Sequence, residues 1–233
     1  LLERREMVVG DLDSQGFSPL YYAISSLNIE ALDILINFGI SQKEITSLKT
    51  NVIHETIMVL SSLYTKNEIW QTERLLKYFI SESDPSLLND ADERGLTPLM
   101  QAVKSKRDYA LELLVERTGV EVNKQNLSGE TALHIAIKMN NQKAFEKLLS
   151  IVGINVNKAD QDGWTPLDLA VNKRSFFKML CDRIDIDFSR AIRTRLHRAI
   201  VTGDQAALMT LLAMSDCQVN SVDYDGISAL ETA

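Results

Sequence analysis

Three histidines are the residues of this chain whose type best suits metal binding or acid–base catalysis. They are His54, His134 and His197, the only histidines among 233 residues. Each falls at the same position of an internal repeat, so one or more whole repeats separate them, and they cannot easily converge on one ion. With all three assigned to equivalent structural positions, none is left to complete a Ser/His/Asp or Cys/His arrangement. We therefore predict no catalytic and no metal site in this sequence.

The other chemically active residues also form no recognisable site. Asp182, Asp185 and Asp187 lie in a predicted loop without a partner group in register, and such acidic runs are usually solvated. Cys181 and Cys217 are too few for a disulfide framework and indicate a reducing compartment. The sequence contains no Gly-rich phosphate loop and no CxxC motif. It predicts a cytoplasmic, non-catalytic chain that needs no cofactor.

A short pattern recurs along the chain with a period of 34 residues where it is clearest. It reads Gly, any residue, Ser or Thr, usually Pro, then Leu, followed by the apolar residues of a helix. A fixed period of this length indicates a solenoid of stacked units. The instances begin at Gly16, Gly95, Gly129, Gly163 and Gly226.

The residues around each Gly predict a tight turn that leads into a helix. Asp or Asn three residues before the Gly can bond amides across the turn, and Gly adopts a positive φ at little cost. Ser or Thr then caps the helix, with Pro19, Pro98 and Pro166 at its first position. Paired apolar residues four apart, as in Ala144-Phe145 and Leu148-Leu149, predict a second amphipathic helix.

These motifs resemble the ankyrin repeat, whose T-P-L-H-x-A signature opens the first helix of each unit. The clearest instance is Gly129-Glu-Thr-Ala-Leu-His-Ile-Ala-Ile137. The resemblance implies an all-α fold, an ankyrin-repeat solenoid of about six helix-turn-helix units joined by β-turn fingers. It also implies that the signature His ties neighbouring turns together. We expect one array over 1–233, with repeats at 1–12 (partial), 13–45, 46–91 (with an insertion), 92–125, 126–159, 160–188 (short), 189–222 and 223–233 (partial).

Two repeats and both ends depart from the pattern. The repeat of His54 lacks the turn Gly and is about a dozen residues too long, so we expect a longer first helix or an ordered loop near 60–70. The repeat before that of His197 is only 29 residues long, so we expect a short outer helix there and a change in stacking at 184–191. The chain starts without Met and ends in a helix predicted from Ser228. We expect it to be part of a longer protein.

Composition excludes some classes of partner. The net charge is −7, which argues against nucleic acid because phosphate binding needs a basic face. The longest uncharged run, 14–29, has 16 residues and includes Gly and Pro, whereas a membrane helix needs ~20 apolar residues. Apolar residues make up 45% of the chain, enough for a continuous core. We expect a monomeric chain with no membrane insertion.

The resemblance implies a protein–protein interaction scaffold that binds a partner polypeptide with its concave groove and finger tips. Large residues directly after the turn Gly are candidate anchors, Trp164 above all, although Trp164 could instead pack on the next finger. Basic residues recur at the ends of three successive first helices, which predicts an acidic or phosphorylated partner unless they are ordinary surface residues. The predicted contacts are Phe17, Leu96, Trp164 and Tyr224 at the tips, and Lys104, Lys106, Arg107, Lys138, Lys173 and Arg174 at the helix ends.

Two alternatives stay open. The repeats could recruit substrate or regulate a larger multidomain enzyme or a secreted bacterial effector, which would place the chain in a host cytosol. They could also form a regulatory or assembly domain of a larger receptor or channel.

One position of the repeat is occupied by Asn four times, at Asn89, Asn123, Asn157 and Asn220. The resemblance implies that such an Asn can be hydroxylated, but we expect its side chain to satisfy turn amides.

Overall fold

Helices alternate with projecting turns in the part of the chain that the structure describes. The computed structural model covers residues 12–43, 45–60, 65–82, 84–170, 173–183 and 185–186, with 205 and 209 besides. These residues belong to two units, which divide between Ile154 and Asn155. The all-α fold that the sequence predicts is confirmed, because the described residues contain helices and no strand beyond one isolated bridge between Phe17 and Thr46.

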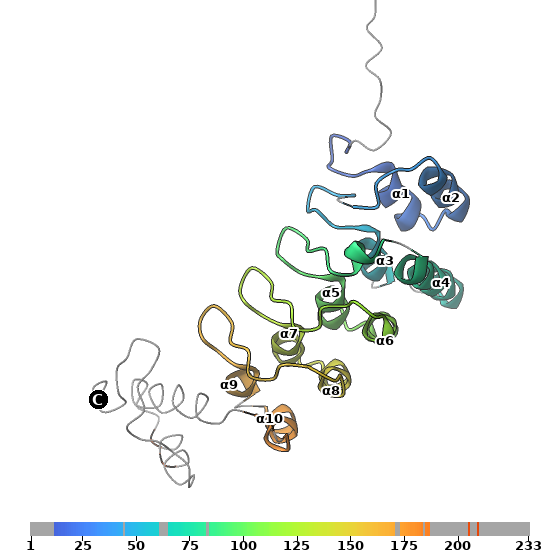
Figure 1. Ribbon diagram of the computed structural model, residues 1–233. Helices are drawn as coiled ribbons and strands as arrows, with labels where there is room; N and C mark the ends of the chain where they lie inside the picture. Colours follow the sequence, from blue (N-terminus) through green and yellow to red (C-terminus); the bar gives the residue numbers. More distant parts are fainter. Residues whose placement is uncertain are drawn as a thin grey trace, which may run out of the picture. The chain divides into compact units, whose positions relative to one another are not determined.

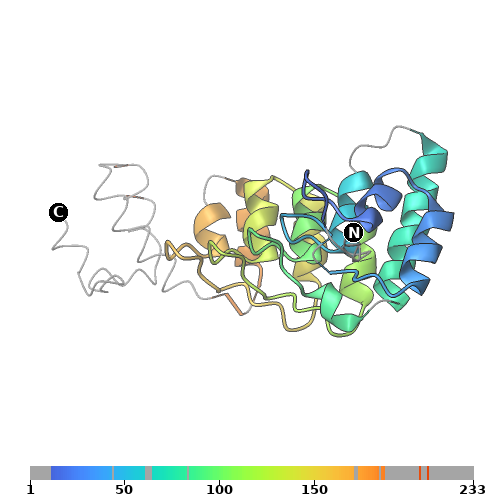
Figure 2. The same cartoon turned by 90° about the horizontal axis from the view of Figure 1, so that it is seen from above.

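In unit 1, one row of inner helices lies beside the turns and a second row of outer helices lies behind it (Figure 1). Seen from above, the turns of this unit project on one side of the helices (Figure 2). The inner helices are α1 (Pro19–Ser25), α3 (Val52–Leu60), α5 (Pro98–Lys104) and α7 (Ala132–Lys138); the outer helices are α2 (Ile29–Asn37), α4 (Lys66–Glu82), α6 (Asp108–Glu116) and α8 (Gln142–Leu149), and a 3₁₀ helix, η1 (Pro85–Leu88), follows α4.

Unit 2 contains one described helix pair, α9 (Pro166–Ala170) and α10 (Arg174–Cys181), whose members pack on each other. Phe176 and Leu180 of α10 are buried. With eight residues, α10 is as long as α8, so the expectation of a shortened outer helix here is wrong.

The predicted helix starts are confirmed. Ser18 accepts a hydrogen bond from the amide of Tyr21, and Thr97 accepts one from the amide of Met100, each with Pro at the next position. Thr165 plays the same part before α9, where the amide of Asp168 donates to its hydroxyl (3.3 Å). These side chains satisfy amides that the first helical turn would otherwise leave without partners.

The turns before the inner helices, which we call fingers, span 13–17, 46–50, 92–96 and 126–130 in unit 1 and 160–164 in unit 2. Asp92 shows the predicted turn chemistry: its Oδ1 accepts from the amides of Arg94 (2.9 Å) and Leu96 (2.7 Å). Gly95 supplies the positive φ, +76°. The same pattern recurs in the fingers that start at Asp13, Asn126 and Asp160.

The finger at 46–50 reaches the same turn without the usual residues. Lys49 takes the position of Gly95 with φ +57°, although a side chain there is strained. Thr46 replaces the Asp, and its hydroxyl accepts from the amide of Leu48 (3.2 Å). Successive fingers of unit 1 are bonded through their backbones: the amides of Ser47, Glu93 and Leu127 donate to the carbonyl oxygens of Gly16, Leu48 and Arg94, respectively.

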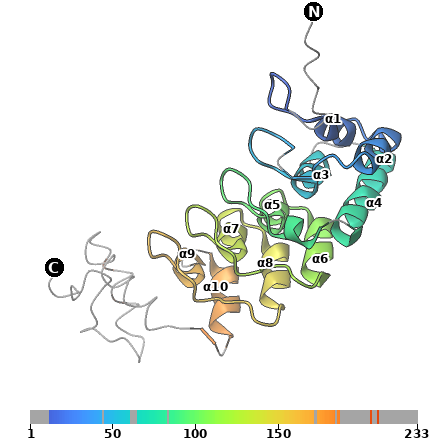
Figure 3. The same ribbon diagram turned by 45° about the horizontal axis from the view of Figure 1, so that its top comes forward.

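The insertion in the repeat of His54 lies mainly in the outer helix. The outer helix α4 has 17 residues against nine in α2 and in α6, whereas the inner helix α3 is only two residues longer than α1 and α5, with nine against seven. Figure 3 shows α4 as the long helix of unit 1. The expected longer first helix therefore accounts for little of the excess. Apolar side chains on α4, such as Phe79 and Leu76, are buried.

Several predictions fall outside the described residues: the partial repeats at both ends, the repeat at 189–222, most of the connection 184–191, and the residues His197, Asn220 and Tyr224. Within the described residues, no helix combines the length and the apolar character that crossing a membrane requires.

Candidate functional site

His54 is a structural residue that joins two fingers. Its ring is 1% exposed, and Nε2 donates to the carbonyl oxygen of Leu96 in the following finger (2.9 Å). The amide of Asn51 points at Nδ1 (3.4 Å). Burial lowers the pKa of His54, so the ring is neutral at physiological pH. The role that the family resemblance implies for this His, a tie between neighbouring turns, is confirmed at His54.

His134 is fully buried and caps its own helix. Its Nδ1 accepts from the amide of Thr131 (3.1 Å) and lies 2.8 Å from the Thr131 hydroxyl. Throughout the described part of the chain, no three His, Cys, Asp or Glu side chains lie close enough to hold a metal ion. The described Asn residues at the repeated position are structural too: Asn89 accepts from the amide of Glu121 (2.8 Å) and donates to the carbonyl of Gly119 (2.6 Å), and Asn123 and Asn157 likewise donate to backbone carbonyls.

The predicted finger-tip residues of unit 1 differ in exposure. Phe17 is half-buried and stacks on Tyr21, with ring centroids 4.0 Å apart. Leu96 is only 4% exposed, so the expectation that it lies exposed at a tip is wrong. The next finger approaches this turn closely: a Cβ on Gly95 would lie 2.5 Å from the amide nitrogen of Leu127. The exposed apolar side chain at that place is Leu127 itself, at 66%.

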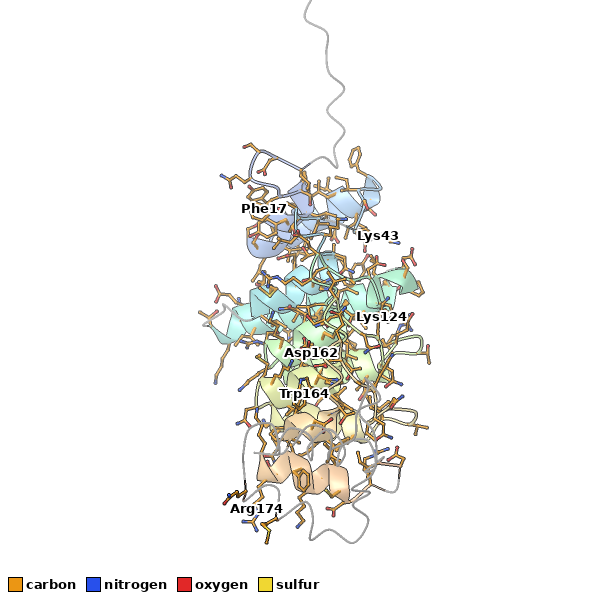
Figure 4. The ribbon with its side chains drawn as sticks, turned by 90° about the vertical axis from the view of Figure 1, so that its left-hand side faces the viewer. Phe17, Lys43, Lys124, Asp162, Trp164 and Arg174 are labelled. Carbon is orange, nitrogen blue, oxygen red and sulfur yellow. The ribbon has the colours of Figure 1, made fainter. Side chains whose placement is uncertain are left out.

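Trp164, the predicted anchor of unit 2, is half-buried. Its amide donates to Asp160 Oδ1 (2.9 Å), and its carbonyl accepts from the Asp160 amide (2.9 Å). The turn therefore fixes the backbone of Trp164. Figure 4 looks onto the fingers and labels Phe17 of unit 1 and Trp164 of unit 2.

Three predicted basic residues lie together at the end of α5. Lys104 is the last residue of the helix, and Lys106 and Arg107 form the connection to α6. Lys106 is exposed and has φ +56°. Neither Lys104 nor Lys106 makes an ion pair with any carboxylate that the structure describes. We call Lys104, Lys106 and Arg107 the basic cluster.

The equivalent residue of the next repeat has a different environment. Lys138 forms an ion pair with Glu130 in its own finger (2.5 Å), which offsets its charge. In unit 2, Lys173 is the residue before α10 and lies 5.9 Å from the ring centre of Phe176, and Arg174 is exposed at the start of that helix. That these residues form one basic stripe with the cluster stays a prediction.

Three further side chains of interest lie on the inner helices, two of them exposed and one, Glu55, half-buried. The fourth residue after each N-terminal cap is Tyr22 in α1 and Glu55 in α3; the seventh residue in α3 is Met58. Tyr22 is 45% and Met58 is 44% exposed. We call these three residues the aromatic–acidic patch. Equivalent positions counted from each cap point to such residues. The seventh residue after the cap is Lys104 of the basic cluster in α5, and its equivalent in α3 is Met58.

Glu55 is held by a chain of hydroxyl groups. The Thr50 hydroxyl donates to Glu55 Oε1 (2.6 Å), and Thr50 itself lies 2.7 Å from the Thr46 hydroxyl. Burial raises the pKa of Glu55, while the bond from Thr50 opposes that shift. The second carboxylate oxygen has no hydrogen-bond partner among the described residues.

Two other surface features carry less chemistry. Trp70 on α4 is half exposed, and the Arg74 guanidinium lies 4.9 Å from its ring centre. A polar depression of about 360 Å³ is lined by Lys43, Lys49 and Asp90 among others, and its Lys43 and Asp90 pair at 3.7 Å. In Figure 4 Lys43 and Phe17 lie on opposite sides of the first repeat, so this depression is not part of the Phe17 side.

Comparison with known proteins agrees with this architecture. The profile of the family "Ankyrin repeats (3 copies)" matches residues 71–160 and 119–191. The solved ankyrin repeat domain of Bcl-3, described as a unique member of the IkappaB protein family, is similar in fold: the TM-score is 0.65, with 21% sequence identity over 94% of this chain and 95% of that one.

A curated human relative, transient receptor potential cation channel subfamily A member 1, is 27% identical over 125 residues. The match includes 54% of this chain but only 10% of that protein, so the chain spans about a tenth of its relative. The profile matches cover more than half of the chain, and the described helices have the predicted repeat geometry. The chain belongs to the family of ankyrin-repeat proteins.

Proposed function

We propose that this chain is a non-catalytic interaction module that binds a partner polypeptide through its fingers and inner helices. Ankyrin-repeat domains are generally protein-interaction modules. Support from this chain comes from the side chains that the fold does not use. Tyr22, Met58 and Leu127 are exposed on fingers and inner helices, and large exposed side chains of this kind often serve as interface anchors.

The basic cluster favours an acidic or phosphorylated segment as the partner. The observation that carries this proposal is that Lys104 and Lys106 have no carboxylate partner within the described residues of a chain whose net charge is −7. Charges left unpaired on an acidic protein attract ligands of opposite charge and speed their association. Phe17, Trp164, Lys138, Lys173 and Arg174 are further proposed contacts, whereas burial removes Leu96 from this set.

A pull-down from cell extract, read by mass spectrometry, tests the proposal. The variant combines Lys104→Glu and Lys106→Glu, and we expect it to lose acidic partners that the original chain captures. The matched control combines Lys77→Glu and Lys147→Glu, which lie on the outer helices α4 and α8 and make the same change in net charge. Equal capture by both variants, at low salt, would refute the basic cluster as a binding site. Trp164→Ala tests the anchor in unit 2 in the same assay.

A second candidate function is a regulatory or substrate-recruiting part of a larger protein. The match to a human cation channel favours it, since the matched segment is only a tenth of that much longer protein. The alternatives of a multidomain enzyme and a bacterial effector are of the same kind. The sequence on either side of these residues in the complete gene distinguishes them.

A further inference from the structure

We infer that the aromatic–acidic patch binds a cationic side chain of the partner, next to an apolar one, while the basic cluster binds an acidic residue of the same segment. The inference rests on the proposed function and adds the chemistry of the partner. The partner segment would then carry opposite charges in a defined order, rather than acidic residues alone.

The patch has the three features that an arginine or lysine side chain needs. Glu55 supplies a carboxylate that Thr50 holds in place (2.6 Å), with one oxygen left for a ligand. Tyr22 supplies an exposed aromatic ring, and a cation is attracted to the face of such a ring. Met58 supplies an adaptable apolar surface for the aliphatic stem of the side chain.

The side chains of the patch are positioned by the fold and not by chance. The Tyr22 hydroxyl donates to Asp13 Oδ2 (2.6 Å), which fixes the ring and lowers the pKa of Asp13. Asp13 therefore adds a second negative charge beside Tyr22. The Gln101 amide contacts Met58 Sδ (2.6 Å), so Met58 lies between its own helix α3 and the next inner helix α5. The patch thus borders α5, the helix that ends with Lys104 of the basic cluster.

The distance between the two charged regions sets how many residues separate the cationic residue of the partner from its acidic residue. Inner helices α3 and α5 pack on each other, and packed helices lie ~8–10 Å apart. An extended segment advances ~3.3 Å per residue, so about three residues separate the cationic residue from the acidic one. A helix would need about six residues, at 1.5 Å each, for the same distance.

Selection from a library of short random peptides on the immobilised chain tests the inference. We expect bound peptides to be enriched in Arg or Lys beside a large apolar residue, with Asp or Glu about three residues away. A selected peptide is then synthesised with Arg and with Gln at the cationic position, and the affinities of both are measured by fluorescence polarisation.

Glu55→Gln is the decisive variant, because it removes the charge and keeps an oxygen that can accept from Thr50. We expect it to bind the Arg peptide about 10-fold more weakly, a change of ~1.4 kcal/mol, and to bind the Gln peptide as the original chain does. Glu112→Gln, on the outer helix α6 and exposed, is the control for net charge and should leave both affinities unchanged.

The outcomes separate this inference from the proposed function. If Glu55→Gln binds the Arg peptide as tightly as the original chain does, while Lys104→Glu with Lys106→Glu abolishes binding, the inference is wrong and the proposed function stands. If no peptide is selected, or the lysine variants bind normally, the proposed function fails as well. A circular dichroism spectrum of each variant shows whether it is folded.

Discussion

Replacement of Gly95 by Ala tests whether the fingers of unit 1 are held together by direct backbone contact. Gly95 has φ +76°, and a Cβ there would lie 2.5 Å from the nitrogen and 3.0 Å from the Cγ of Leu127. Gly39, at the end of α2, is a matched control. Its φ is +78°, and no described atom lies within 4 Å of the added Cβ.

The two substitutions should differ in how much they destabilise the fold, because only Gly95→Ala disturbs the contact between fingers. A non-glycine residue in the left-handed region costs ~1–2 kcal/mol, and Ala recovers ~0.5–1 kcal/mol because it lowers the entropy of the unfolded chain. Gly39→Ala should therefore destabilise by about 0.5–1 kcal/mol. Gly95→Ala adds ~1–3 kcal/mol for overpacking and ~1 kcal/mol for the hydrogen bond from Leu127 to Arg94. Its total should be about 2.5–5 kcal/mol.

Urea unfolding followed by circular dichroism measures both free energies, and amide hydrogen exchange reports on Leu127 itself. We expect the Leu127 amide to lose protection in Gly95→Ala and to keep it in Gly39→Ala. The reasoning would be refuted if Gly95→Ala were no more destabilising than Gly39→Ala, since the fingers would then not be in contact at this point.

Three further predictions concern the repeat of His54. Lys49→Gly should raise the free energy of unfolding by about 0.5–1 kcal/mol, because it relieves the strain at φ +57°; Lys49→Ala, which keeps the strain, should not. The pKa of His54 is lowered by burial, so its contribution to stability is present above 6.5, its ordinary value, and is lost as the pH falls below it. His54→Gln should flatten this part of the curve of unfolding free energy against pH, and an unchanged slope would contradict the assignment. The pKa of Glu55 is raised, so stability is present below its ordinary value of 4.5 and is lost as the pH rises through the folded value. Glu55→Gln should therefore gain stability relative to the original chain near neutral pH and lose that advantage under acid conditions, as thermal unfolding at a series of pH values would show.

The helices and turns could be predicted from the sequence because their causes are local. Ser18 and Thr97 cap helices that begin with Pro, and the Asp92 side chain bonds two amides of its own five-residue turn, where Gly95 has a positive φ. Such interactions need no distant partner. The same logic failed for the insertion near 60–70, where neither propensity nor period says which helix of a pair lengthens. In the structure it is the outer helix α4 that lengthens, with 17 residues against nine in α6.

Exposure on the fingers depends on the packing of neighbouring repeats and side chains. Leu96 and Phe17 hold equivalent positions in the sequence, yet Leu96 is buried and Phe17 is only half-buried. The next finger approaches both turns closely, because a Cβ on Gly16 would lie 2.6 Å from Ser47 and one on Gly95 would lie 2.5 Å from Leu127. The side chains differ in their packing, since the Phe17 ring stacks on Tyr21 and stays partly exposed. Ion pairing also differs between repeats: Lys138 pairs with Glu130 of its own finger, while Lys104 in the preceding repeat has no described carboxylate partner.

The sequence by itself predicted the family of the fold and the positions of most of the described helices. Tertiary structure alone decided which residues of each repeat stay open to a ligand. The physical reason is one of range. Caps and turns form between residues that are near neighbours in the chain, whereas burial depends on what the adjacent repeat places, some thirty residues on, against the same side chain.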